Sequence, residues 1–231
     1  MEPSPGHLLR RALGAVAQAD ARRAGWIRLR RLLARSTGPY RVELGAGLIR
    51  REGWIPTDVW WRARFHLDAT RPWPFPPGSA SHVYADNVIE HVPIDGGRAL
   101  LRHSLEALEP GGRIRLVTPD VERCAEVYLE RGELARAQLD AHRGAGTRVE
   151  HAVDILRGVF IEYEHYRGYA WDFEALSAEL GAAGFESIER CELEDSSDPV
   201  LRGLESRVLP VDRVTMLAVE ARAPMTGGAR A

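Results

Sequence analysis

Residues 42–47 read VELGAG, an apolar strand end that carries one acid and runs into two closely spaced glycines. Gly45 and Gly47 permit a tight turn and a close approach of the backbone to a ligand, because a Cβ atom there would collide with the ligand or forbid the backbone angles. The stretch therefore predicts a nucleotide-binding turn after the first strand of an α/β domain.

Two more acids, Asp58 and Asp68, follow this turn at short intervals and join Glu43 in lining the pocket. A pyrophosphate cofactor brings negative charges, which three carboxylates would disfavour. S-adenosylmethionine instead brings an ammonium, a sulfonium and ribose hydroxyls, and ionised carboxylates accept hydrogen bonds from such donors. The charge pattern therefore favours S-adenosylmethionine as the cofactor.

The composition fits one soluble α/β domain, since the 231 residues are 45% hydrophobic and 28% charged. All 31 basic residues are arginine, so no lysine is present for Schiff-base chemistry. Cys124 and Cys191 lie far apart and neither has a cysteine or histidine at metal-ligand spacing, so we expect no metal and a reduced, cytoplasmic protein. No run approaches the roughly 18 apolar residues of a bilayer span, so stable membrane insertion is not expected.

The N-terminal segment 1–38 is basic, with eight arginines against two acids, a net charge of +6 that leaves −8 for residues 39–231. Helically spaced apolar residues predict two amphipathic helices with a break near Ala24 and Gly25. They are Leu9, Leu13, Val16, Trp26, Leu29 and Leu33. The segment is either an arm for an anionic membrane or nucleic acid, or a helical extension that packs on the domain. The second alternative is favoured because no aromatic stacking platform accompanies the arginines, so no nucleic-acid partner is expected.

From residue 39 onward, short strand-like runs alternate with helical ones. The expected strands are 40–44, 54–57, 64–67, 82–85, 113–117, 187–193 and 213–221. This alternation predicts a Rossmann-like, doubly wound sheet that is mainly parallel. The interval from Gly47 to Trp54 is too short for a crossover helix, so we expect the first crossover helix to be vestigial. The last two strands lack a full helix between them, so we expect the last strand to be antiparallel.

Helices are expected at 97–108 and 121–130, the second capped by Thr118 with Pro119 at its first turn, and at a later segment between Asp172 and Gly184. Residues 131–171 form a polar, aromatic insertion after the fifth strand, too long for an ordinary connection and expected to be mostly helical. Ligands of open α/β sheets lie beyond the carboxyl ends of the strands. The insertion is therefore the predicted cap over the substrate.

The chain resembles the class I S-adenosylmethionine-dependent methyltransferases, and among them the type 11 methyltransferase-like proteins. The resembling stretches, in the family's order, are VELGAG (42–47), GWIPTD (53–58), LDA (67–69), VYADNVIEH (83–91) and LEPGGRI (108–114). With the helix before the sixth strand, the resemblance covers roughly residues 40–122 and 172–221.

The resemblance implies a cofactor site at the first four strands. Glu43, Gly45, Ala46 and Gly47 would hold the methionine portion, and Asn87 would lie beneath it. Asp58 would accept hydrogen bonds from the ribose hydroxyls. Asp68 and Ala69 would face the adenine. The alternative is that Asp58 and Asp68 are surface acids of a turn or strand end, but their ordered company favours the functional interpretation, more strongly for Asp58 than for Asp68.

Two positions depart from a dinucleotide fingerprint. Its third glycine would fall at Arg50, and Asp58 comes too early for its ribose acid, which is expected about 20 residues beyond the motif. Both features disfavour a nicotinamide-dependent oxidoreductase. A methyltransferase tolerates the loss of the third glycine.

A hydroxyl acceptor must lose its proton, for which a near-neutral histidine is suited. His91, after the fourth strand, and His165, in the insertion, are the candidate catalytic residues, although either could be structural. Tyr163, Tyr166 and Tyr169 are the candidate substrate-binding residues. We predict O-methylation of a small-molecule, sugar or glycan-precursor hydroxyl. The alternatives are a methyltransferase-fold protein that binds the cofactor or a partner without turnover, and the disfavoured oxidoreductase.

Overall fold

The computed structural model describes residues 5–205 and 212–225 of the chain. Its elements, in chain order, are α1 (Pro5–Leu33), β1 (Tyr40–Leu44), β2 (Ile55–Asp58), β3 (Phe65–His66), β4 (Ala80–Asp86), η1 (Ile89–His91), α2 (Ile94–Ala107), β5 (Leu108–Pro119), α3 (Val121–Glu130), α4 (Glu133–Gly144), α5 (Asp154–Phe160), η2 (Glu162–Arg167), α6 (Phe173–Ala183), β6 (Glu186–Cys191), η3 (Arg213–Thr215) and β7 (Met216–Arg222).

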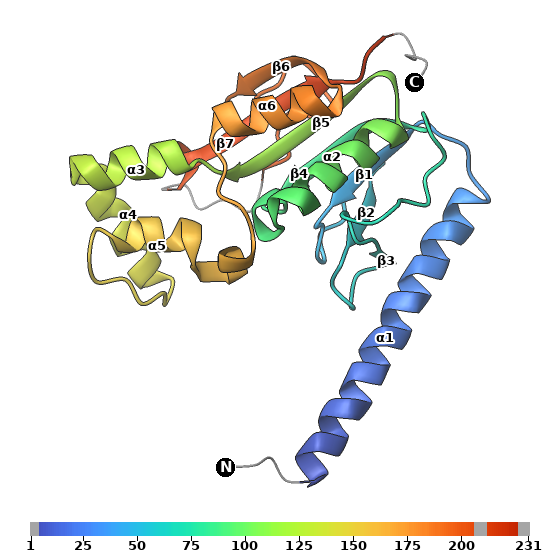
Figure 1. Ribbon diagram of the computed structural model, residues 1–231, viewed down its shortest axis with the longest axis horizontal. Helices are drawn as coiled ribbons and strands as arrows, with labels where there is room; N and C mark the ends of the chain where they lie inside the picture. Colours follow the sequence, from blue (N-terminus) through green and yellow to red (C-terminus); the bar gives the residue numbers. More distant parts are fainter. Residues whose placement is uncertain (1–4, 206–211, 226–231) are drawn as a thin grey trace.

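All seven strands form one sheet in the order β3-β2-β1-β4-β5-β7-β6 (Figure 1). Strands β1 to β5 are parallel to one another, whereas β7 runs antiparallel to both β5 and β6. Residues 45–54, all described, contain no helix, so the short link between β1 and β2 lacks a crossover helix as expected. The mixed sheet and its antiparallel strand confirm the predicted Rossmann-like methyltransferase fold.

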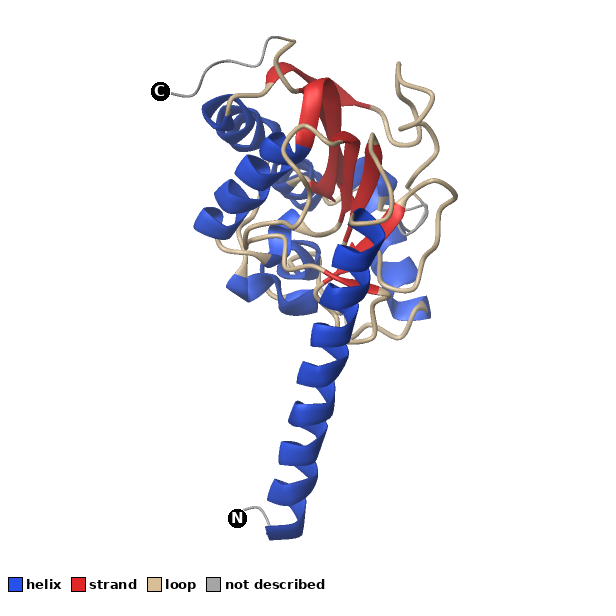
Figure 2. Ribbon diagram, turned by 90° about the vertical axis from the view of Figure 1, so that its right-hand side faces the viewer, coloured by secondary structure: helices blue, strands red, loops and turns tan. Residues whose placement is uncertain are grey.

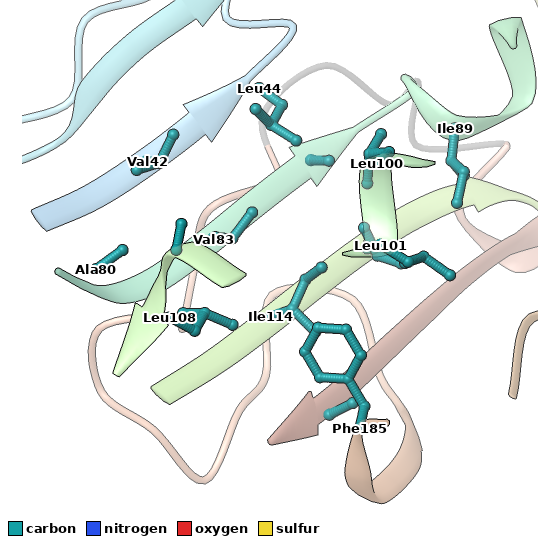
Figure 3. Packing of buried hydrophobic residues seen from close by; sticks show 14 of the residues in the cluster. Val42, Leu44, Ala80, Val83, Ile89, Leu100, Leu101, Leu108, Ile114 and Phe185 are labelled. Atoms are coloured by element: carbon teal, nitrogen blue, oxygen red, sulfur yellow. The ribbon is translucent and has the colours of Figure 1, made fainter. Parts of the chain in front are cut away.

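One face of the sheet carries the main hydrophobic core. Val42 of β1, Val83 of β4 and Ile114 of β5 are paired across neighbouring strands, so their side chains point to the same face, and all three are fully buried. Leu100 and Leu101 of α2 pack on them, and Phe185 closes the cluster below α6 (Figure 3). This packing fixes the position of the carboxyl end of β1 relative to that of β4.

The opposite face is polar and is covered by the coil of residues 192–205. Tyr84 of β4 is fully buried there, and the ring of Trp54 lies edge-on to it with centroids 6.0 Å apart. Leu201 and Leu204 of the coil complete a small second cluster, to which no described helix contributes a residue. Because no crossover helix links β1 and β2, this face of the sheet is covered by a coil segment.

The N-terminal segment forms one helix, α1, so the predicted break near Ala24 and Gly25 is wrong. A Cβ atom on Gly25 would lie 2.8 Å from Cβ of His66 and 2.9 Å from its backbone nitrogen, so the glycine allows α1 to approach β3. Leu29 is fully buried, and Arg28 Nε donates to the carbonyl of Arg64 at 2.8 Å. The other end of α1 extends away from the domain (Figures 1 and 2).

Helix ends in the second half of the chain follow their capping residues. The N-cap of α3 is Asp120, whose Oδ1 accepts from the amide of Glu122 at 3.1 Å, so the predicted cap at Thr118 is wrong. Asp172 caps α6 as expected, and Gly184 ends it with φ at 103°. The insertion folds as α4, α5 and η2, beyond one end of the sheet (Figure 1). In the described part of the chain, α1 included, no helix offers the apolar length that a bilayer crossing requires.

Candidate functional site

The glycine turn after β1 meets the end of β2 and the segment after β4. The amide of Gly47 donates to Oδ2 of Asp58 at 2.8 Å, and the amide of Ala46 donates to the carbonyl of Thr57 at 2.9 Å. Gly45 has φ at +64°, and a Cβ atom on it would lie 2.4 Å from Cγ2 of Val88. The structure therefore brings together the predicted cofactor residues of β1 and β2 and requires a glycine at position 45.

Asp58 keeps acceptor capacity after it has closed this turn. Its Oδ2 accepts from Gly47, and its Oδ1 accepts from the amide of Trp60 at 2.7 Å. An ionised carboxylate offers about four lone-pair positions. About two positions on Asp58 therefore remain for ligand hydroxyls, as a ribose would require.

Glu43 is buried and belongs to the polar face of the sheet. Its Oε1 accepts from Nη1 of Arg51 at 2.9 Å, and the Arg51 guanidinium lies 5.5 Å from the centre of the Tyr84 ring. Arg51 also donates to the carbonyl of Leu204 in the covering coil. A ligand ammonium at Glu43 would thus share the carboxylate with Arg51.

Asp68 and Ala69 form the turn after β3. Oδ1 of Asp68 accepts from both the amide and the hydroxyl of Thr70, at 3.0 and 2.7 Å, and Oδ2 lies 3.2 Å from Nε of Arg71. The carbonyl of Ala69 accepts from the indole of Trp73. These contacts give Asp68 a local role in the turn, and its part in adenine binding stays a prediction.

A cavity of about 470 Å³ lies where β4 and β5 end, beneath the insertion. Its walls come from the ends of the two strands, from α3, from the insertion and from the segment that enters β7. The lining includes Asn87, His91, Pro119, Cys124, Gln138, His142, Arg157, His165, Asp212 and Thr215. The insertion therefore lies over a space at the carboxyl edge of the sheet, and its role as a cap over the substrate stays a prediction.

Asn87 connects the glycine turn to this cavity. Its backbone has φ at 54°, its amide donates to the carbonyl of Val117 at 2.9 Å, and its Nδ2 donates to Oδ1 of Asp86 at 3.0 Å. The next residue, Val88, is the one that packs beneath Gly45. A ligand on the glycine turn and a ligand in the cavity would therefore meet near Asn87.

The two candidate catalytic histidines come together in the cavity wall, with ring centroids 4.7 Å apart. Nδ1 of His165 lies 3.1 Å from the carbonyl of Gly158 and 3.0 Å from that of Val159. Carbonyls only accept, so Nδ1 carries the proton and Nε2 keeps its lone pair. Burial lowers the pKa of His165, which favours this neutral form.

Glu90 is a functional candidate that the sequence analysis missed. It is only 3% exposed, Oε2 accepts from the hydroxyl of Thr118 at 3.1 Å, and burial raises the pKa of its carboxyl to about 8. A ligand-capable atom of Glu90 lies within 4.8 Å of such atoms on His91 and His165. The available signal was its place beside His91, but its burial depends on residues far along the chain.

The predicted substrate-binding tyrosines lie elsewhere in the insertion. Tyr166 is 60% exposed and its hydroxyl accepts from Nε of Arg167. The Tyr169 ring lies 4.7 Å from that of Trp171, and neither tyrosine is among the residues lining the cavity. The side chain of Tyr163 lies outside the described part of the chain. The role of the tyrosines in binding the acceptor stays a prediction.

A second polar group in the cavity comes from α4 and the segment before β7. Gln138 Nε2 donates to the Thr215 hydroxyl at 3.0 Å, and Nε2 of His142 lies 3.2 Å from Oδ1 of Asp212. Gln138 and His142 are four residues apart and so share one helix face, which is a signal that the sequence contains. Their direction toward Asp212 could be seen only in the fold.

Comparison with known proteins finds no match to any protein-family model and none among the curated proteins by sequence. Membership of the type 11 group therefore stays a prediction. Solved structures with a similar arrangement include the CurJ carbon methyltransferase, with 14% identity and a TM-score of 0.45, covering 82% of this chain and 49% of that one. Phosphoethanolamine N-methyltransferase 2 of Haemonchus contortus has 13% identity and a TM-score of 0.47, with coverage of 87% and 52%. A SAM-dependent methyltransferase of Archaeoglobus fulgidus has 16% identity and a TM-score of 0.46, with coverage of 87% and 94%.

This chain spans about half the length of the first two of these proteins. At such identities and TM-scores the likeness decides nothing about the reaction. The case for a function rests on the glycine turn, Asp58 and the cavity of this chain.

Proposed function

We propose that this protein is an S-adenosylmethionine-dependent methyltransferase that methylates a hydroxyl of a small molecule held in the cavity. The observation that carries the proposal is the shared boundary at Asn87 and Val88. The glycine turn and Asp58 lie on one side of it and the 470 Å³ cavity on the other. A methyl donor and its acceptor need this relation, because transfer requires the two to meet in line.

The geometry of the turn supports this donor over a dinucleotide. A dinucleotide-binding fold places the pyrophosphate at the N-terminus of the helix that follows the glycines. Residues 45–54, which the structure describes in full, contain no helix to provide that terminus. Asp58 instead offers free acceptor positions to ribose hydroxyls, and Gly47 borders open space, since a Cβ atom on it would meet nothing within 4 Å.

The acceptor would occupy the cavity, whose volume lies in the range of about 300–1,000 Å³ usual for small-molecule sites. Gln138, His142 and Arg157 add a few polar groups to walls that are otherwise mostly apolar, with Leu139 and Val149 among their residues. These polar groups can bind an acceptor hydroxyl, and we propose a sugar, a glycan precursor or another small hydroxylated compound.

Bound at the turn, S-adenosylmethionine would supply a methyl group on a positively charged sulfur, which leaves as a neutral thioether. Asp58 would fix the ribose, and Gly45 and Gly47 would let the backbone approach the methionine portion. His91 and His165 face the cavity and would act on the acceptor's proton, because its loss makes the oxygen a better nucleophile. Glu90 adjoins the two histidines and completes this group.

Incubation with a methyl-labelled donor and a pool of hydroxylated acceptors tests the proposal. We expect the wild-type protein to label at least one acceptor. In Asp58→Asn, which keeps the shape of the side chain, we expect cofactor affinity to fall about 10- to 100-fold, since a hydrogen bond to a charged group contributes about 1.5–3 kcal/mol.

Asp95→Ala is the matched control, because Asp95 is an exposed acid of the first turn of α2, outside the site. It should label acceptors at the wild-type rate. Circular dichroism should show that Asp58→Asn remains folded despite the role of Asp58 in the turn. Cofactor binding without any label transfer by the wild-type protein would favour the alternative, a binding protein without turnover.

A further inference from the structure

We propose that Glu90, His91 and His165 bind a divalent transition-metal ion of the Zn²⁺ or Mn²⁺ class at the wall of the cavity. One ligand-capable atom from each residue lies within 4.8 Å of those of the other two. Two imidazoles and one carboxylate are a donor set that such ions take in proteins, often with positions left open for a further ligand. The nitrogen and oxygen donors do not select between the two ions.

The carboxyl of Glu90 is built into the protein in the manner of a metal ligand. It is 3% exposed, and within the described residues its Oε1 has no hydrogen-bond partner. Burying an oxygen without a hydrogen-bond partner raises the free energy of the folded protein, and a bound metal ion would offset this penalty. Oε2 is held by the hydroxyl of Thr118 at 3.1 Å, which orients the carboxyl from behind.

His165 is oriented in the same way. Its Nδ1 donates to the carbonyls of Gly158 and Val159, which both lie in α5, and so Nε2 is the ring nitrogen that can bind a metal ion. Metal-binding histidines commonly give their second ring nitrogen to a carbonyl or carboxylate, because this fixes both tautomer and ring direction. The hydrogen bonds that would orient Glu90 and His165 as metal ligands are therefore already present.

The position of the site explains what the ion would do. His91 and His165 line the cavity, so the open side of the cluster faces the space proposed for the acceptor. An ion there would polarise an acceptor oxygen and weaken its hold on the proton, and with the ion bound His165 would act as its ligand and would not take the proton itself. This catalytic role rests on the proposed function, whereas the binding of the ion does not.

No metal is predicted from the sequence, because neither cysteine has a cysteine or histidine at metal-ligand spacing. Glu90 and His91 are adjacent, but His165 lies 74 residues beyond His91 and reaches it only because Trp171 and Gly168 return the chain to η1. Nε1 of Trp171 donates to the carbonyl of Ile89 at 3.3 Å. A Cβ atom on Gly168 would lie 1.6 Å from the carbonyl oxygen of Glu90.

The test uses the full chain, freed of metal by chelation, without methyl donor or acceptor. Titration with Zn²⁺ and Mn²⁺ by calorimetry, and with Co²⁺ followed by visible absorption, should show one site per chain for at least one ion. In Glu90→Gln and His165→Asn we expect this site to be lost. Thr118→Val removes only the outer contact and should weaken binding about 10- to 100-fold.

His142→Asn is the matched control, since His142 lines the same cavity but pairs with Asp212 and not with the cluster. It should bind the ion as the wild-type protein does. No stoichiometric binding of any of the three ions would overturn the proposal, as would binding that survives in both ligand variants while the variants remain folded by circular dichroism. Because no methyl donor is present, these results are independent of the test of the proposed function.

Discussion

Replacing Arg115 by methionine is expected to lower the free energy of unfolding by about 3–5 kcal/mol, since removing one partner of a buried ion pair leaves an uncompensated charge. Arg115 lies on the polar face of β5 and is fully buried. It contacts Oε1 of Glu205 at 2.6 Å and Oε1 of Glu220 at 2.5 Å. The variant would leave the buried carboxylate of Glu205 without its cation and that of Glu220 with Arg113 alone, at 3.4 Å.

Arg115 also holds the coil of residues 192–205 on the sheet. Its guanidinium donates to the carbonyls of Glu192 and Asp195 at 2.9 and 3.0 Å, and the other oxygen of Glu205 accepts from the amide of Glu194. Loss of these contacts should loosen the cover over Tyr84. The coil is therefore expected to become more open to proteolysis in Arg115→Met.

Urea denaturation followed by circular dichroism measures the effect. Arg98→Met is the matched control, because Arg98 also pairs with a glutamate, Glu179, but at the surface. Its unfolding midpoint should stay close to that of the wild-type protein, since exposed ion pairs contribute little. An Arg115→Met protein with the same midpoint as Arg98→Met would show that the buried network does not hold the coil.

Replacing His165 by asparagine is expected to reduce the rate of methyl transfer by about 10²- to 10⁴-fold, the usual contribution of a positioned proton-transfer group. Asparagine has no atom at the position of Nε2, the ring nitrogen that does not donate to the Gly158 and Val159 carbonyls. His165 lines the cavity, whereas the glycine turn and Asp58 are not among the residues that line it. The affinity for S-adenosylmethionine should therefore stay unchanged.

Single-turnover rates with labelled donor, set beside cofactor affinity from calorimetry, separate these two effects. His103→Asn serves as the control, because His103 lies on α2 near Glu106 and outside the cavity. It should transfer methyl groups at the wild-type rate. A His165→Asn protein with an unchanged rate would remove His165 from the reaction.

The parts of the fold that the sequence predicts well are those determined by local chemistry. Helix α6 begins after Asp172, whose Oδ1 accepts from the amide of Ala175 at 2.7 Å, and ends at Gly184 in the left-handed region. Strand β1 follows from its apolar alternation and the glycines after it. The antiparallel β7 is predicted because the sequence before it has no pattern of a full-length helix.

The parts that the sequence does not predict depend on contacts between distant segments. Gly25 indicates a helix break, but its lack of a side chain serves the approach of α1 to His66. Arg115 and Glu205 are 90 residues apart, so nothing local indicates a charge network in a strand. The same holds for the site, where Asp58 could be predicted from its motif but the contact of Glu90 with His165 could not.

Calorimetric titration of the wild-type protein with S-adenosylmethionine, and separately with NAD, tests the central claim most directly. We expect one site per chain for S-adenosylmethionine or its demethylated product, weakened in Asp58→Asn, and no heat of binding with NAD. Binding of NAD together with no binding of S-adenosylmethionine would contradict the assignment of the glycine turn and Asp58 to a methyl donor.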